Sequence, residues 1–122
     1  MRIPALELTA DFDALAWKST NVEGVSWLPL HVEGSASGAT RGAATVLIRM
    51  EPGASYGAHR HLGDEEVLVL SGGYRDERGV YPRGTFVHYE AGSEHRPVAC
   101  EDEGVCILFA VATGGIELLG GA

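Results

Sequence analysis

Residues 53–72 read GASYGAHRHLGDEEVLVLSG, and no other stretch of the chain says more about its architecture. It has the spacing G-x5-H-x-H-x3-E-x6-G. Side chains alternate along a β-strand, so His59 and His61 share one face and can hold one metal ion from neighbouring pleats. A second stretch, from Gly84 to His95, supplies another histidine behind its own glycines. The two stretches together predict a metal site on paired strands.

The glutamates of the first stretch offer a carboxylate ligand. If the inward set of side chains continues from the histidines to Glu65, then Glu66 points to the opposite face; this register holds unless the turn at 62–64 breaks it. The predicted metal ligands are therefore His59, His61, Glu65 and His95. Imidazole and carboxylate suit Fe(II), Mn(II), Zn(II), Ni(II) or Cu(II) and disfavour Cu(I) and iron–sulfur clusters. We expect one divalent metal ion per chain, Fe(II) or Zn(II) first, with Mn(II) or Ni(II) as alternatives.

The rest of the chain consists of short β-prone runs separated by glycine and proline. No segment keeps helical periodicity beyond about two turns. The expected strands cover residues 25–32, 44–51, 55–61, 66–70, 72–76, 85–89, 95–99, 105–113 and 116–119. Strands this short and closely spaced are typical of a sandwich or barrel. The sequence predicts one all-β barrel domain over residues 21–122, preceded by an arm, residues 1–20, that packs on the barrel or on a dimer partner.

Composition limits the partners of the chain. Its 122 residues suffice for one domain with its own core, and its formal net charge is −8. Nucleic acid and anionic membrane surfaces would repel such a chain, so neither is expected as a partner. No window approaches the roughly 18 apolar residues of a membrane span, and the first residues lack the apolar run of a secretory signal. We expect a cytoplasmic protein whose two cysteines are reduced.

The two stretches resemble the paired motifs of the cupins, a family of small β-barrels or jelly rolls. The motif positions matched are Gly53, His59, His61, Glu65 and Gly72 in the first motif and Gly84, Gly92 and His95 in the second. Glu90 stands where the family has proline and Ala99 where it often has asparagine, and neither departure removes a ligand. The sequence around the histidines is similar to RmlC-like cupins of the ChrR-like anti-sigma factor type and their free-standing relatives. The resemblance implies a double-stranded β-helix with a metal inside the barrel.

The resemblance leaves several functions open, because cupins include enzymes, sensors and storage proteins. Four ligands around octahedral Fe(II), Mn(II) or Ni(II) leave two positions for a small bidentate molecule such as a diketone or hydroxyketone, which suits a dioxygenase. In an isomerase or lyase the metal would polarise a carbonyl. The same ligands fill a tetrahedral Zn(II) shell, which suits a regulator of the ChrR-like type or a binding protein with a structural metal. We expect a small-molecule ligand in the barrel and a homodimer.

Other side chains have weaker assignments. Catalytic residues are not defined by the sequence, and Glu66 and His88 are the candidates for moving a proton. Tyr56 could reach a pocket, although nothing in its spacing requires it. Trp27 is expected to pack at a barrel end rather than stack on a substrate. The charged run Asp-Glu-Arg at 76–78 is expected to be a solvated turn that needs no function.

Overall fold

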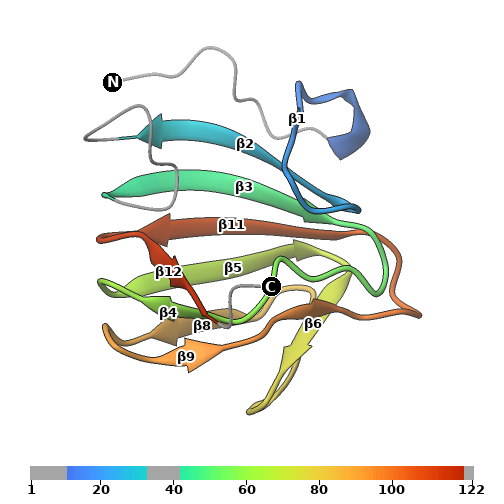
Figure 1. The fold of residues 1–122 in the computed structure, drawn as a ribbon. Coiled ribbons are helices and arrows are strands. Elements are labelled where there is room, and N and C mark those ends of the chain that lie inside the picture. Colours follow the sequence, from blue (N-terminus) through green and yellow to red (C-terminus); the bar gives the residue numbers. More distant parts are fainter. Residues whose placement is uncertain (1–10, 33–41, 120–122) are drawn as a thin grey trace.

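The structure is a computed structural model that describes residues 11–32 and 42–119. Within these ranges one short 3-10 helix, η1 (Phe12–Ala14), precedes a series of β-strands (Figure 1). The strands are β1 (Lys18–Ser19), β2 (Val25–Val32), β3 (Ala44–Met50), β4 (His59–His61), β5 (Glu65–Ser71), β6 (Gly73–Asp76), β7 (Gly79–Pro82), β8 (Phe86–Tyr89), β9 (Glu94–His95), β10 (Val98–Ala99), β11 (Cys106–Ala112) and β12 (Ile116–Leu118). The predicted all-β fold is confirmed.

The strands form one large and two small antiparallel sheets. The six-stranded sheet has the order β1-β2-β3-β11-β5-β8, and its long members run side by side across Figure 1. The three-stranded sheets have the orders β12-β4-β9 and β10-β6-β7. β4 lies in the middle of the first small sheet, between β12 and β9. This position places the H-R-H sequence of β4 at the centre of a sheet, with a partner strand on each side.

Alternating burial along β5 shows which face of the large sheet points inward. Glu65, Val67 and Val69 are buried, whereas Glu66 and Leu68 are exposed. The buried core draws on all parts of the barrel wall, namely Val25, Met50, Val67, Val69, Tyr74, Tyr89, Ala99, Cys106, Leu108 and Ala110. The period of two therefore puts a carboxylate, Glu65, at the end of an otherwise apolar inward row.

Gly72, the last glycine of the first motif, has a conformational reason to be glycine. Its φ is +63°, a region that L side chains rarely adopt. A Cβ at this position would also clash with the backbone carbonyl of Val105. Gly72 therefore allows β5 to end in a tight turn directly beneath the chain that leads into β11.

Three local features differ from the expected strand boundaries, and the first is that the expected strand 55–61 is a strand only at β4, His59–His61. β7 lies outside the expected strands, yet it pairs with β6 as a hairpin in which Asp76 lies opposite Gly79. The expected strand 95–99 is two strands, β9 and β10, separated by Arg96 and Pro97. Proline lacks the N–H that a ladder needs, so the break falls where the backbone cannot pair.

The predicted arm, residues 1–20, is described only from residue 11 onward. In the described part, β1 adds to the edge of the large sheet beside β2, and Asp13 forms an ion pair with Arg49 of β3 at 3.2 Å. Within residues 11–32 and 42–119, no helical segment has the length and apolar character needed to cross a membrane.

Candidate metal centre

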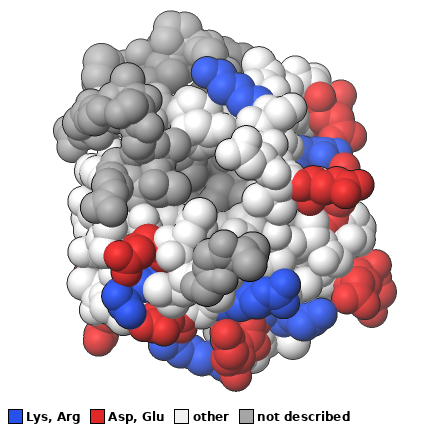
Figure 2. Space-filling model, in the orientation of Figure 1, with Lys and Arg blue, Asp and Glu red and all other residues white. Residues whose placement is uncertain are grey.

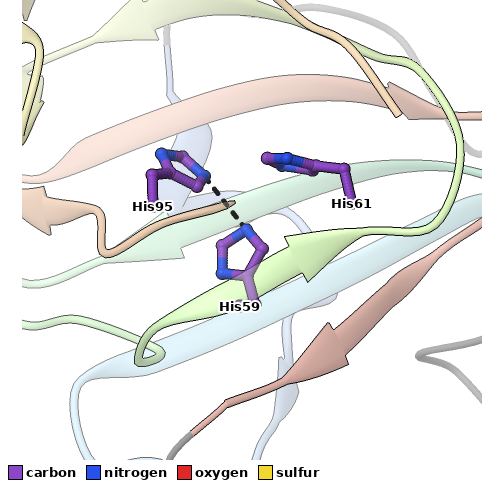
Figure 3. Close-up of side chains that lie close together, drawn as sticks. All are labelled: His59, His61 and His95. Atoms are coloured by element: carbon purple, nitrogen blue, oxygen red, sulfur yellow. Dashed lines mark hydrogen bonds between the residues drawn. The ribbon is translucent and has the colours of Figure 1, made fainter. Parts of the chain in front are cut away.

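Three histidines meet inside the barrel. His59 and His61 lie at the two ends of β4, and His95 lies on β9 directly opposite His59 in the strand register. Their exposed fractions are 0%, 1% and 4%. Each offers one ligand nitrogen, and these nitrogens all lie within 4.8 Å of one another. Figure 3 shows the rings turned toward a common point, as the alternation of β4 predicts.

Hydrogen bonds at the outer ring nitrogens fix the tautomer of each histidine. Each Nδ1 faces an oxygen that accepts a hydrogen bond, so in each neutral ring Nδ1 carries the hydrogen. The acceptors are the carbonyl of Gly57 for His59 at 3.1 Å, the carbonyl and hydroxyl of Ser93 for His61 at 3.2 and 3.0 Å, and the carboxylate of Asp76 for His95 at 2.8 Å. All three Nε2 atoms therefore present lone pairs to the centre of the cluster.

These lone pairs face one another without a proton between them. The Nε2 atoms of His59 and His95 are 3.0 Å apart, the contact drawn as a dashed line in Figure 3. His61 Nε2 is a buried atom with no hydrogen-bond partner, although Glu65 Oε1 lies 2.8 Å away. That short distance lacks hydrogen-bond geometry and joins two electron-rich atoms. Such an arrangement needs a cation to stabilise it.

Burial makes a proton a poor candidate for that cation. Burial, together with repulsion from His95, lowers the pKa of His59 to about 3. Burial also lowers the pKa of His95, although its hydrogen bond to Asp76 opposes the shift. A divalent ion suits neutral imidazole nitrogens and bears a larger charge than a proton. The donor set present in the structure therefore fits a divalent metal.

Glu65 lies beside this cluster without being part of its tightest group. The set of donor atoms that lie within 4.8 Å of one another comprises the three histidines only, among the described residues. Glu65 is 6% exposed, pairs with Tyr89 of β8 in the register and contacts His61. The turn at 62–64 leaves the inward parity of Glu65 intact, because Glu65, Val67 and Val69 are all buried.

Asp76 is a residue of the site that sequence reasoning missed. It was expected to lie in a solvated turn, but its side chain is 0% exposed and faces His95. Although burial alone would raise its pKa, hydrogen bonds from His95 and its other donors lower the pKa of this carboxyl. The other donors are Arg78 N at 2.9 Å, Tyr81 Oη at 2.9 Å and Tyr89 Oη at 3.0 Å. An ionised carboxylate behind a ligand nitrogen orients the ring and raises its basicity.

Strand parity contained the signal that would have identified Asp76. On β6, Tyr74 is buried and Arg75 is exposed, so the next inward position is Asp76. Tyr74 and Tyr89 extend the same network through a 2.6 Å contact between their hydroxyls. Tyr89 also stacks on His61, with ring centroids 4.8 Å apart. Packing and hydrogen bonds thus hold the histidine rings from behind.

The structure places the two proton-transfer candidates away from the histidines. Glu66 and His88 are both exposed and lie opposite each other on β5 and β8, on the face of the sheet that points out of the barrel. His88 lies 3.2 Å from Asp64, whose other oxygen accepts a hydrogen bond from Ala91 N. These contacts tie two surface loops together.

A cavity of about 390 Å³ opens next to the cluster. Most of its wall is apolar, with Val25, Trp27, Val46, Ile48, Ile116 and Leu118 among the lining residues. Glu65 and Tyr56 also line it, so Glu65 is shared by the cavity wall and the histidine cluster. Figure 2 draws the face of the molecule that is turned to the viewer in Figure 1. The described surface at the centre of that face is uncharged, while charged residues gather toward its lower and right edges.

Comparisons with known proteins agree with this architecture. The chain aligns with the anti-sigma factor ChrR in its complex with SigE from Rhodobacter sphaeroides, at 29% identity and a TM-score of 0.67. That alignment covers 84% of this chain and 50% of the ChrR chain, so this chain spans half the length of that relative. A search of curated protein sequences found no significant match.

Two dioxygenase structures share the fold at lower identity. A putative acetylacetone dioxygenase from Methylibium petroleiphilum aligns at 18% identity with a TM-score of 0.72, covering 95% of this chain and 83% of that one. An acetylacetone dioxygenase from Acinetobacter johnsonii aligns at 14% identity with a TM-score of 0.69, covering 95% and 78%. Residues 6–114 match the sequence profile described as the ChrR cupin-like domain. The chain therefore belongs to the ChrR cupin-like family.

Proposed function

We propose that this chain is a mononuclear metal-dependent enzyme of the dioxygenase type that acts on a small diketone-like or hydroxyketone-like substrate. His59, His61 and His95 would hold the metal, with Glu65 as the fourth ligand. The observation that carries the proposal is that buried, unprotonated Nε2 atoms converge beside a cavity whose wall includes Glu65. A structural metal needs no adjoining cavity for a small molecule, whereas a catalytic one does.

The protein groups around the centre have separable tasks. Gly57, Ser93 and Asp76 hold the histidine tautomers, so that the ligand nitrogens are ready without a proton being lost from the ring. The apolar cavity wall excludes water from the substrate and orients it toward Glu65. When bound, the metal would supply Lewis acidity and redox chemistry. Glu66 and His88 have no task in this proposal, because both are exposed on the outer face.

The membership of the chain in the ChrR cupin-like family supports a second candidate, a non-catalytic Zn(II)-binding sensor or regulatory domain. Its ligands would be the same, and three histidines with a carboxylate complete a tetrahedral Zn(II) shell. The two candidates differ in whether the cavity next to Glu65 receives a substrate. This candidate predicts tight Zn(II) and no turnover of any small molecule.

Oxygen uptake distinguishes the two candidates. Protein loaded anaerobically with Fe(II) is mixed with pentane-2,4-dione or a hydroxyketone in an oxygen electrode, with free Fe(II) as the blank. The enzyme proposal predicts oxygen uptake that requires substrate and is lost in His95→Ala. The matched control is His88→Ala, which removes an exposed histidine and should leave uptake unchanged. Tight Zn(II) that Fe(II) cannot replace, with no uptake for any substrate tested, would support the regulatory candidate.

A further inference from the structure

The cavity wall is unsuited to a negatively charged ligand. No described residue that lines it is a lysine, arginine or histidine, and its one charged lining residue is the acidic Glu65. Apart from the proposed metal ion, an anion that entered would find no described cation in the wall, would lose its water and would face the carboxylate of Glu65. The apolar majority of the wall instead suits a ligand with a hydrocarbon body.

Tyr56 is the described tyrosine whose hydroxyl is left for a ligand. The hydroxyls of Tyr74, Tyr81 and Tyr89 all take part in the network around Asp76. Tyr56 lines the cavity, and within the described residues its hydroxyl has no hydrogen-bond partner. A phenol is protonated at neutral pH and can donate one hydrogen bond to an oxygen acceptor.

The ring of Tyr56 is held in place beside the centre. It stacks on His59 with ring centroids 5.0 Å apart and an interplanar angle of 20°. The polar residues that also line the cavity are Thr20 and Asn21, and the Thr20 hydroxyl already donates to the carbonyl of Val25 at 2.7 Å. Tyr56 is therefore a fixed donor between the histidine cluster and the apolar wall.

We propose that Tyr56 orients the ligand by donating a hydrogen bond to its oxygen, and that this cavity selects neutral, mostly apolar oxygen-donor molecules over carboxylates of the same size. The inference rests on the proposed function, since it assumes a metal ion held by the histidines. It adds to that function a preference for uncharged ligands and names the residue that hydrogen-bonds them.

Isothermal titration calorimetry on protein loaded with Zn(II) tests the inference without turnover. The probes are pentane-2,4-dione and acetoacetate, which have similar sizes and differ by one charged group. We expect the dione to bind at least tenfold more tightly. Tyr56→Phe keeps the stacked ring and should weaken dione binding roughly 2- to 12-fold, the effect of one neutral hydrogen bond. The affinity of this variant for Zn(II) should stay within twofold of the original protein, because phenylalanine keeps the ring that stacks on His59. If Tyr56 acted through packing alone, the variant would change metal binding instead of dione binding.

Thr113→Val is the control, because it removes an exposed hydroxyl that donates to the carbonyl of Asp64 and lies outside both the cavity lining and the network around Asp76. It should leave dione affinity within twofold of the original protein. Acetoacetate binding as tightly as the dione, or a Tyr56→Phe variant with unchanged dione affinity, would overturn the inference, while Zn(II) binding would leave the metal site of the proposed function standing. Failure of the original protein to bind Zn(II) would instead overturn the proposed function and the inference that rests on it.

Discussion

Replacing Asp76 by asparagine should weaken metal binding even though Asp76 is not itself a proposed ligand. Asp76 accepts the Nδ1 proton of His95 at 2.8 Å and has a fully buried side chain. The substitution removes the negative charge that makes His95 a better donor at Nε2. It also replaces one acceptor oxygen by an NH₂ group, which then faces either His95 and Tyr89 or Arg78 and Tyr81.

The magnitude follows from the role of a carboxylate behind a metal-binding histidine. Loss of such a partner weakens metal affinity roughly 10- to 100-fold, which equals about 1.4–2.7 kcal/mol of binding free energy. Asp76 also accepts three other hydrogen bonds that hold β6 and β7 against the histidines. Loosening of these contacts should weaken metal affinity further, so we expect the loss of affinity to lie toward about 100-fold.

Competition against a chromophoric chelator measures the dissociation constant for Zn(II) in each variant. Glu77→Gln is the matched control, because it removes one negative charge from the neighbouring residue. The Glu77 carboxylate accepts a hydrogen bond from Arg96 N rather than from a histidine, so this variant should bind within twofold of the original protein. Equal dissociation constants for folded Asp76→Asn, Glu77→Gln and the original protein would show that Asp76 does not strengthen metal binding through His95.

Three further predictions concern the ligands, the pH dependence and the backbone. Replacing His61 by alanine should abolish stoichiometric metal binding while the circular dichroism spectrum stays that of the folded barrel; retained occupancy would remove His61 from the ligand set. In metal-free protein, the pKa of His59 is about 3 against 6.5 for the free side chain, so protons bind the unfolded chain preferentially. Urea titrations should show the full free energy of unfolding above pH 6.5. Below that pH, His59 should lower the free energy of unfolding toward pH 3 by up to about 1.4 kcal/mol per pH unit. A profile that stays flat between pH 6.5 and 3 would contradict this. Gly72→Ala should destabilise the fold more than Gly84→Ala, because both glycines have positive φ but only at Gly72 would a Cβ clash with backbone atoms. Thermal denaturation should show a loss of about 2–3 kcal/mol in the free energy of unfolding for Gly72→Ala and about 1 kcal/mol for Gly84→Ala. Equal losses would refute the clash.

The fold could be predicted because its pattern is carried by local sequence. β2 covers the predicted range 25–32, since glycine punctuation and a run of apolar residues define both its ends. β7 could not be predicted in the same way, because four residues ending in proline give no clear alternation. Its strand character comes from pairing with β6, which is a tertiary contact. The break between β9 and β10 could have been anticipated from Pro97.

The histidines of the site were predictable, whereas their support was not. His59 and His61 are two residues apart, and strand alternation alone puts them on one face. The hydrogen-bond acceptor of each Nδ1 depends on which other segment of the folded chain lies next to that histidine. Gly57 lies nearby in sequence, but Asp76 reaches His95 from a different sheet. The charged run at 76–78 was expected to be solvated because three adjacent charges usually are, and only the parity of β6 separates the buried Asp76 from its neighbours.

We propose above all that His59, His61 and His95 hold one divalent metal ion. Elemental analysis of untagged protein purified anaerobically tests it directly, with His95→Ala and the exposed-histidine control His88→Ala analysed in parallel. We expect one divalent ion per chain in the original protein and in His88→Ala, and none in His95→Ala. Protein that contains no metal after purification and after incubation with Fe(II), Mn(II) or Zn(II), or full occupancy in folded His95→Ala, would contradict it.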